Sequence, residues 1–297
     1  MIFLVTGGRG FIGSHFVELV LEKGHEVIDV DKLTYASSRK LPWDNHKNYR
    51  FVNDDIVNMT HLPYCDIIVN FAAESHVDNS IESPKTFFES NSRGVFNLLE
   101  LIRGKVYNKP LFFHISTDEV YGDIREASFT EDDKLNPGNP YSASKASAEM
   151  LVLAYNKTFG LDYVITRSSN NYGERQYVEK LIPQIIHSLE TNHKIPIHGD
   201  GSYIRDWIYV KDNVNAIYFL IENNIKNDTF NIAADNHMSN LQVTEEVCKW
   251  YGYDNYLDYV DFTENRLGQD VRYSIDSSKL CNLGWAPEMK KGIHKWI

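Results

Sequence analysis

The sequence predicts an α/β fold in which a doubly wound parallel sheet carries a smaller mixed α/β lobe toward the C-terminus. Through the first two thirds of the 297 residues, short apolar runs alternate with helix-length segments, as in parallel strands joined by helices. A glycine-rich turn follows the first apolar run. After about residue 167 the alternation gives way to shorter, mixed elements, which predict the lobe.

Each strand is predicted from a short apolar run bounded by turn-forming residues. The predicted strands are Ile2–Val5, Glu26–Val30, Tyr49–Val52, Asp66–Asn70, Leu111–Ser116 and Asp162–Thr166. The helices between them are predicted at Phe11–Leu21, Pro84–Arg103 and Tyr141–Phe159. In the later part, helices are expected near residues 178–189, 211–222 and 241–250, with strand-like runs such as "DWIYV" and "TFNIA" between them.

Composition excludes several classes of partner. The formal net charge of −11 argues against sequence-independent binding to nucleic acid, which needs basic patches. The three cysteines are widely spaced and no pair has metal-ligand spacing, so no metal site is predicted. No apolar run approaches the ~20 residues that cross a bilayer, and "MIFLVTGG" enters a strand at once. We therefore expect a cytoplasmic protein without a membrane partner.

The turn "VTGGRGFIG" has the spacing Gly7-x-x-Gly10-x-x-Gly13 between a strand and a helix. Such glycines allow a tight turn, a close approach of the backbone to a pyrophosphate, and close packing of the helix on the strand. Asp31 ends the second strand, 18 residues after Gly13, where a carboxylate binds the adenosine ribose and repels a 2′-phosphate. The pattern predicts an NAD-binding Rossmann-type domain at residues 1–167, with room for later segments to return to it, and a substrate-binding lobe in most of residues 168–297.

Two further motifs carry polar side chains that are suited to chemistry. In "YSASK", Tyr141 and Lys145 are four residues apart and share one face of a helix, so the lysine charge is expected to lower the pKa of the tyrosine. In "STDEVYG", Thr117, Asp118 and Glu119 follow the strand Leu111–Ser116, and strand ends in α/β proteins usually face a ligand crevice. The alternative for both motifs is an ordinary solvated surface.

Taken together, these motifs resemble those of the extended short-chain dehydrogenase/reductase superfamily, and within it the nucleotide-sugar 4,6-dehydratases. The resemblance covers nearly the whole chain, because "TGGRGFIGSHF", "DKLTYAS", "FAAESHVDNSI", "STDEVYG", "NPYSASKASAE", "RSSNNYGERQYVEKLIP", "HGDGSYIRDWIYVKDN" and "RYSIDSSKLCNLGW" have counterparts there in the same order. Epimerases and decarboxylases of the superfamily share the glycine turn and the Tyr/Lys pair. They lack the adjacent acid pair, which is the specific signal.

The resemblance implies a reaction in which a hexose attached to dTDP or UDP loses water and becomes a 4-keto-6-deoxy sugar nucleotide. It implies that Tyr141, supported by Lys145, takes the proton of the C4 hydroxyl, and that Thr117 orients that hydroxyl. It further implies that Glu119 removes the C5 proton and that Asp118 protonates the departing C6 hydroxyl. NAD is the implied cofactor.

The resemblance also implies two sets of binding residues and a partner. For NAD these are Gly7, Gly10, Phe11, Ile12, Gly13, Asp31, Lys32, Leu33, Thr34, Asp55, Ile56, Phe71, Ala72, Ala73, Ser75, Ser90, Tyr141, Lys145 and Asn171. For the sugar nucleotide they are Ser75, Thr117, Asn170, Lys180, Leu181, Pro196, Ile197, His198, Arg205, Asn240, Arg266 and Gln269. A homodimer is implied, through a four-helix bundle formed by the helices Pro84–Arg103 and Tyr141–Phe159, whose apolar residues beyond one core face include Phe87, Phe88, Val95, Leu98, Leu151 and Leu153.

Two departures from the family pattern and two alternatives remain. Gln269 in "RLGQD" replaces a histidine of the family, and the chain stops at "GIHKWI", where the family usually continues. The first affects substrate contacts and the choice between thymine and uracil, which the sequence leaves open. The alternatives are a sugar-nucleotide 4-epimerase or decarboxylase, and a non-catalytic sensor of NAD or of a sugar nucleotide. The acid pair argues against both.

Overall fold

Seven parallel strands form the central sheet, in the order β10-β6-β5-β4-β1-β2-β3. In this computed structural model, residues 1–105, 108–265, 270–289 and 291–296 are described. The strand order reverses between β1 and β4, which is where doubly wound sheets bind ligands at their carboxyl ends. The strands are β1 (Ile2–Thr6), β2 (Glu26–Val30), β3 (Tyr49–Val52), β4 (Ile67–Asn70), β5 (Leu111–Thr117), β6 (Tyr163–Ser168) and β10 (Asp228–Ile232).

The first six of these strands confirm the prediction, with ends that agree within two residues. The seventh, β10, comes from the C-terminal part of the chain and pairs with β6. Segments beyond residue 167 therefore return to the large sheet.

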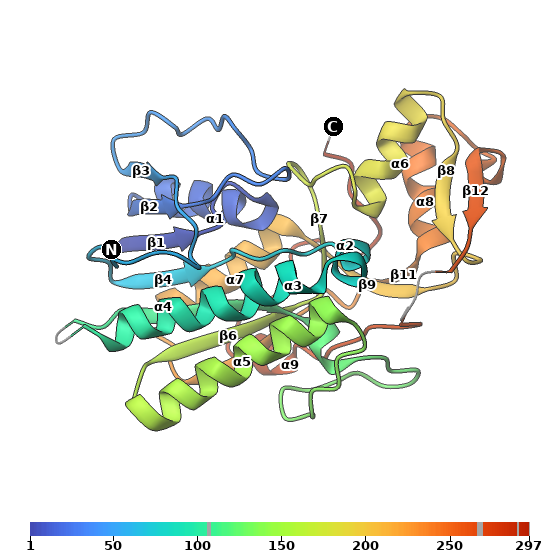
Figure 1. Cartoon of the computed structure of the whole chain (residues 1–297). Coiled ribbons are helices and arrows are strands. Elements are labelled where there is room, and N and C mark those ends of the chain that lie inside the picture. Colours follow the sequence, from blue (N-terminus) through green and yellow to red (C-terminus); the bar gives the residue numbers. More distant parts are fainter. Residues whose placement is uncertain (106–107, 266–269, 290, 297) are drawn as a thin grey trace.

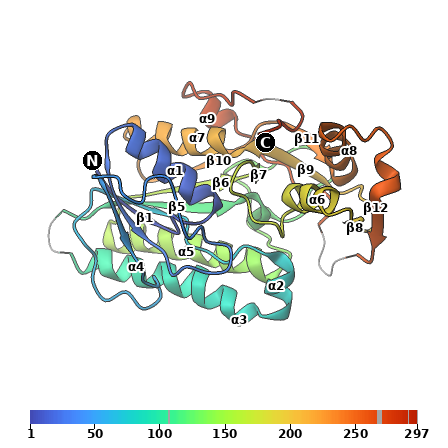
Figure 2. The same cartoon turned by 90° about the horizontal axis from the view of Figure 1, so that it is seen from above.

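Helices cover both faces of this sheet (Figures 1 and 2). On one face lie α1 (Phe11–Glu22), α7 (Val210–Glu222) and α9 (Ser278–Cys281), and their apolar side chains join those of Phe3 and Val5 in one core. On the other face, α4 (Gly94–Arg103) and α5 (Pro140–Phe159) pack over Leu4 and Ile68. The strands are buried on both sides, which explains their nearly continuous apolar runs.

The predicted helix 84–103 is interrupted by one wider turn. It consists of α3 (Pro84–Phe87), the π-helical segment η1 (Phe88–Arg93) and α4, and it follows the short α2 (Val77–Glu82). A Cβ at Gly94 would lie 2.6 Å from the side chain of Ile56, so a larger residue there would require that side chain to move. The wider turn faces Ser90, Asn91 and Ser92 inward, and π-helical turns are often found at functional sites.

The smaller lobe contains two short sheets with helices packed on them, at the right of Figure 1. One sheet has the order β11-β9-β7 and the other pairs β12 with β8. Its core includes Ile182, Trp207 and Val243. The elements are β7 (Asn170–Tyr172), α6 (Leu181–Glu190), β8 (Ile195–His198), β9 (Ile204–Tyr209), β11 (His237–Ser239), α8 (Asn240–Trp250), β12 (Val260–Thr263) and the 3₁₀ segment η3 (Tyr256–Tyr259).

The helix α5, which carries the "YSASK" motif, has strong local signals at both ends. Asn139 forms a capping box with Ser142, Pro140 occupies the first turn, and Gly160 ends the helix in a left-handed conformation with φ of 64°. No helix within the described part of the chain is both long enough and apolar enough to span a membrane.

Candidate active site

The glycine turn between β1 and α1 leaves a cradle at the edge of the sheet. Gly7 has φ of +71°, and a Cβ there would lie 2.7 Å from the backbone nitrogen of Ala72. A Cβ at Gly13 would overlap the carbonyl of Gly7. Gly10 is the N-cap of α1 and has no side chain to cap the first N–H groups of the helix, so they can meet a phosphate. These features fit a dinucleotide.

A cavity extends from this cradle along the carboxyl ends of the central strands. All of the predicted NAD-binding residues line it except Leu33 and Asn171. Leu33 has φ of 59°, and its N–H donates to Asp31 instead. Asn171 lines a second cavity. Residues that sequence reasoning missed also line the first cavity, and they include Ser37, Asp54, Ser116 and Tyr177.

The acid pair begins a 3₁₀ turn at the end of β5, in the segment η2 (Asp118–Tyr121). The hydroxyl of Thr117 accepts the N–H of Glu119 at 3.3 Å and donates to Asp118 Oδ1 at 3.2 Å. Glu119 Oε2 accepts from Asn139 Nδ2 and from the hydroxyl of Tyr273, both at 3.4 Å. The turn therefore fixes both carboxyl groups beside one threonine.

The two carboxyl groups hold protons more tightly than carboxyl groups in water. Asp118 is 3% exposed, and its Oδ2 has no hydrogen-bond partner among the described residues. Burial, followed by the charge of Glu119, raises the pKa of Asp118 from 3.8 to about 8. Burial also raises the pKa of Glu119, although the nearby guanidinium of Arg205 opposes this. At neutral pH, Asp118 is thus a carboxylic acid that can donate a proton.

Tyr141 and Lys145 lie on α5 and line the cofactor cavity. Lys145 Nζ donates to the carbonyl of Ile115 on β5 at 2.6 Å, and burial lowers the pKa of Lys145 to about 8. The expectation of a lowered pKa for Tyr141 is wrong for the polypeptide alone. Burial, with a smaller contribution from Glu119, raises the pKa of Tyr141, and a hydrogen bond with Thr117 only partly opposes the rise.

The second cavity lies between the large sheet and the smaller lobe. Of the predicted substrate residues, it is lined by Ser75, Asn170, Lys180, Leu181, Pro196, Ile197, His198, Arg205 and Asn240. Thr117 lines neither cavity directly, and Arg266 and Gln269 lie outside the described residues. The guanidinium of Arg205 lies over the ring of Tyr273, with its Cζ 4.2 Å from the ring centroid. It donates to the carbonyls of Ile204, Asp270 and Val271.

The two cavities meet at a small set of shared residues. Both are lined by Ser75, Gln176, Glu179 and Lys180, and Lys180 Nζ donates to the carbonyl of Ser75 at 2.8 Å. Tyr141 faces the first cavity and Glu119 the second. A molecule in the second cavity therefore meets Glu119 and lies next to the cavity that Tyr141 and Lys145 line.

Sequence reasoning missed several residues of the second cavity. Glu179, Asp270 and Tyr273 line it, and Tyr273 donates to Asp270 Oδ2 at 2.6 Å. The signal was present, because the quoted motifs "RQYVEKLIP" and "RYSID" contain Glu179 and Tyr273. Within the described residues, no group of three or more His, Cys, Asp or Glu side chains could hold a metal ion.

Comparison with known proteins places this site in a family. A family model described as GDP-mannose 4,6 dehydratase matches residues 4–294, which is nearly the whole chain. The chain belongs to this family. The match confirms the resemblance to nucleotide-sugar 4,6-dehydratases within the extended short-chain dehydrogenases.

Curated relatives match over nearly their full length. The chain is 44% identical to the low-salt glycan biosynthesis protein Agl12 of Haloferax volcanii, over 97% of this chain and 94% of that protein. It is 38% identical to the dTDP-glucose 4,6-dehydratase of Haemophilus influenzae, over 100% of this chain and 97% of that enzyme.

Solved structures of the family share the fold. DesIV, a dTDP-glucose 4,6-dehydratase from Streptomyces venezuelae with NAD and TYD bound, superposes with a TM-score of 0.92 at 38% identity, covering 97% of this chain and 92% of that one. The UDP-glucuronic acid 4-epimerase of Bacillus cereus, in complex with UDP-glucuronic acid and NAD, has a TM-score of 0.89 at 27% identity, with 97% and 95% coverage.

Proposed function

We propose that this chain is an NAD-dependent nucleotide-sugar 4,6-dehydratase, a hydro-lyase that converts dTDP-glucose to its 4-keto-6-deoxy derivative and water. The observation that carries the proposal is the pair of carboxyl groups beside Thr117: Asp118 is buried, and Glu119 lines the cavity that adjoins the cofactor cavity. The relatives at 38% identity are named dTDP-glucose 4,6-dehydratases, which favours dTDP over UDP as the nucleotide. UDP-glucose is the alternative substrate.

The first step assigned to the site is the oxidation of C4. The phenolate oxygen of Tyr141 takes the proton of the C4 hydroxyl, and the ammonium group of Lys145 stabilises this phenolate before the transfer. Thr117 orients the same hydroxyl through its hydrogen bond. NAD, held by the residues that line the first cavity, would supply the hydride acceptor for C4 and later the hydride for C6, and C5 would regain a proton as C6 receives that hydride. The pKa of Tyr141 is raised in the polypeptide alone, and the positive charge of a bound nicotinamide would lower it.

The second step is the loss of water across C5 and C6. The 4-ketone acidifies the C5 hydrogen, and Glu119 removes it as the general base. Asp118, which burial keeps protonated, donates its proton to the departing C6 hydroxyl. Two adjacent carboxyl groups are thus proposed to perform opposite proton transfers. The charge of Glu119 adds to the rise in the pKa of Asp118, whereas Arg205 opposes the rise in the pKa of Glu119.

The binding residues named from the sequence are proposed in the same roles. Asp31 lines the first cavity at the end of β2, where it would meet the adenosine ribose of NAD and repel the 2′-phosphate of NADP. Residues 1–167 with the returning segments would hold the cofactor, and most of the remainder of residues 168–297 would hold the sugar nucleotide. Arg205, whose guanidinium reaches the second cavity, is proposed to bind the diphosphate.

We also propose a homodimer formed through the helices of one face. Phe88 of η1, Phe96 of α4, and Met150 and Phe159 of α5 are 57%, 45%, 48% and 43% exposed. The expectation that Phe87, Val95 and Leu98 would face a partner is wrong, because Phe87 is buried and Val95 and Leu98 belong to the core over the sheet. The exposed side chains lie on neighbouring helices, which suits a four-helix bundle across a two-fold axis (Figure 2).

The test is turnover of dTDP-glucose and UDP-glucose, followed by mass analysis of the product. We expect a product that has lost one water, and no net reduction of NAD⁺. Glu119→Gln should stop water loss, whereas Glu126→Gln, which removes a charge from an exposed position on the same loop, should not. An epimer of unchanged mass would instead assign a 4-epimerase, and no turnover of either substrate would contradict the proposal.

A further inference from the structure

Arg9 occupies an unusual place inside the glycine turn. It lies between Gly8 and Gly10, yet its side chain is only 6% exposed and does not line the cofactor cavity. The guanidinium packs on the ring of Phe51 at 4.1 Å. An arginine beside a phosphate-binding turn would ordinarily be read as a phosphate ligand, but this one points away from the cavity, below the turn.

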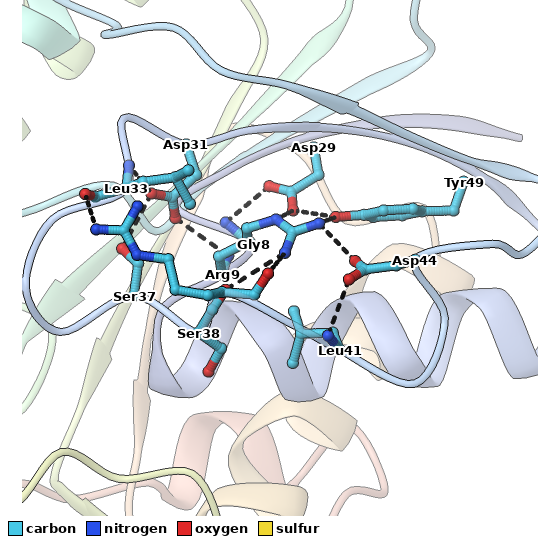
Figure 3. Close-up of polar contacts among 11 residues, drawn as sticks. Gly8, Arg9, Asp29, Asp31, Leu33, Ser37, Ser38, Leu41, Asp44 and Tyr49 are labelled. Atoms are coloured by element: carbon cyan, nitrogen blue, oxygen red, sulfur yellow. Dashed lines mark hydrogen bonds and ion pairs between the residues drawn. The ribbon is translucent and has the colours of Figure 1, made fainter.

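The partners of Arg9 lie on the segment that joins β2 to β3, called here the β2–β3 segment (residues 32–48) (Figure 3). Its Nη2 donates to Asp44 Oδ1 at 2.5 Å, and its Nη1 donates to the carbonyls of Ser38 and Arg39 at 3.3 and 3.2 Å. The main chain of Arg9 adds a further link, because its carbonyl accepts the N–H of Ser38 at 2.8 Å. Arg9 thus makes four hydrogen bonds to the β2–β3 segment.

A second carboxylate holds the turn itself in place. Asp29 on β2 is fully buried, and its Oδ1 accepts the N–H of Gly8 at 3.0 Å. Its Oδ2 accepts from the hydroxyl of Tyr49 at 2.7 Å, and that hydroxyl accepts from Arg9 Nη2 at 3.2 Å. A Cβ at Gly8 would overlap the Asp29 carboxylate. Turn, second strand and third strand are therefore joined in one buried network (Figure 3).

The gripped segment supplies one wall of the cofactor cavity. Lys32, Thr34, Ala36 and Ser37 line the cavity. Asp31, just before the segment, accepts the N–H of Arg9 at 3.1 Å and of Leu33 at 2.7 Å, and the hydroxyl of Ser37 at 3.1 Å.

Asp44 is itself anchored to the core. Its Oδ2 accepts the N–H of Leu41 at 3.0 Å, and the side chains of Leu41 and Trp43 belong to the core on the α1 side of the sheet. A fixed carboxylate at residue 44 therefore determines where the guanidinium of Arg9 can hold the chain.

We propose that Arg9 and Asp44 form a clamp that positions the β2–β3 segment as the adenosine wall of the cofactor cavity, so that cofactor affinity depends on two residues that do not touch the cofactor. Both are positioning residues. The inference rests on the proposed function only for the identity of the ligand, NAD; the clamp itself is a property of the polypeptide.

The test uses Asp44→Asn, which keeps the shape of the side chain and removes its charge. Leaving a buried guanidinium without its partner is costly, so the segment should leave its cavity-forming conformation for much of the time. If that conformation is populated at about 1–10%, the Kd for NAD⁺ rises about 10–100-fold, because the apparent affinity scales with the competent fraction. Titration calorimetry of cofactor-stripped protein measures this. Arg9→Lys keeps the charge but loses the fork, and should give a smaller loss in the same direction.

Hydrogen exchange of the cofactor-free protein provides a second readout. We expect faster exchange in residues 32–48 of Asp44→Asn, unchanged exchange in α5, and an unchanged kcat at saturating NAD⁺. The matched control is Glu245→Gln, which removes the exposed ion pair with Lys249 on α8 and should alter none of these values.

Three results would overturn the clamp: a Kd within about twofold of wild type, faster exchange spread evenly over the chain, or faster exchange in the segment with no change in Kd. If wild-type protein fails to bind NAD⁺ at all, the proposed function fails, and the exchange of residues 32–48 still decides whether Arg9 and Asp44 hold the segment.

Discussion

The raised pKa of Asp118 predicts how the elimination step responds to pH and to substitution. With a pKa of about 8, about nine-tenths of Asp118 is protonated at pH 7. An aspartate with an ordinary pKa would be protonated in only about one molecule in a thousand at that pH. Burial, together with the charge of Glu119, thus raises the protonated fraction of Asp118 at pH 7 by roughly three orders of magnitude.

The perturbation is a pH series from 7 to 9 on wild type and on Asp118→Asn. The protonated fraction of wild-type Asp118 falls about tenfold over this range, so the elimination step should slow about tenfold. Asp118→Asn should lose about 10²–10⁴ in elimination at pH 7, and its residual rate should lack this dependence on Asp118. C4 oxidation does not use the acid and should survive better.

Rapid mixing with dTDP-glucose separates the two steps, since absorbance of the reduced nicotinamide reports oxidation and quenched-flow mass analysis reports water loss. Enzyme-bound NADH, or a 4-keto sugar that retains its C6 oxygen, should accumulate in Asp118→Asn. An elimination rate in wild type that stays flat from pH 7 to 9, or wild-type elimination by Asp118→Asn, would refute the assignment of Asp118 as the acid.

The same pKa has a consequence for stability that can be measured without substrate. The folded pKa of Asp118 lies above its ordinary value of 3.8, so the folded protein holds a proton that the unfolded chain releases between these two pH values. Stability contributed by this group therefore falls as pH rises from about 4 to about 8. The free energy of unfolding of Asp118→Asn, measured with denaturant at several pH values, should lack that part of the decrease with pH.

Three other substitutions test separate parts of the structure. Tyr141→Phe removes the hydroxyl that takes the C4 proton, and we expect no NADH formation on mixing with substrate, whereas slow but complete oxidation would contradict its role. Phe96→Glu places a charge on the proposed dimer face and should convert a wild-type dimer to a monomer in sedimentation analysis. A wild type that is itself a monomer at micromolar concentration would contradict the proposed dimer. Glu149→Gln breaks the buried ion pair with Arg167 and should lower the free energy of unfolding by about 3–5 kcal/mol, whereas the exposed Glu89→Gln should change it by less than about 1 kcal/mol.

Much of the fold was predictable because its signals are local. Apolar runs define the strands, and Asn139, Pro140 and Gly160 define the ends of α5. The place of β10 in the sheet was not predictable, because its partner β6 lies far back in the sequence and strand pairing depends on contacts between distant segments. The π-helical turn at residues 88–93 also escaped, since the surrounding pattern is that of an ordinary helix.

In the site, motifs identified which groups meet but not their electrostatics. The positions of Glu119, Tyr141 and Lys145 on the cavity walls followed from strand ends and helix spacing, and Asp118 lies buried beside Glu119 without lining either cavity. The raised pKa of Tyr141 did not, because burial and the carboxylates come from the folded surroundings. The inward path of Arg9 was equally hidden, since an arginine in a glycine-rich loop suggests an exposed or ligand-binding side chain.

The return of the chain to the sheet bears on how the protein can be made. Strand β10 covers the open edge of β6, and α7 lays Val214, Ile217 and Leu220 on the face that carries α1. While the first 167 residues leave the ribosome, that edge and the part of that face beneath α7 have no cover, since only α1 is present on it. The first 167 residues therefore cannot complete their core until at least residue 232 has emerged, and a fragment cut at residue 167 would expose a bare strand edge that favours aggregation. We therefore expect residues 1–167 and the segments that return to their sheet to fold together.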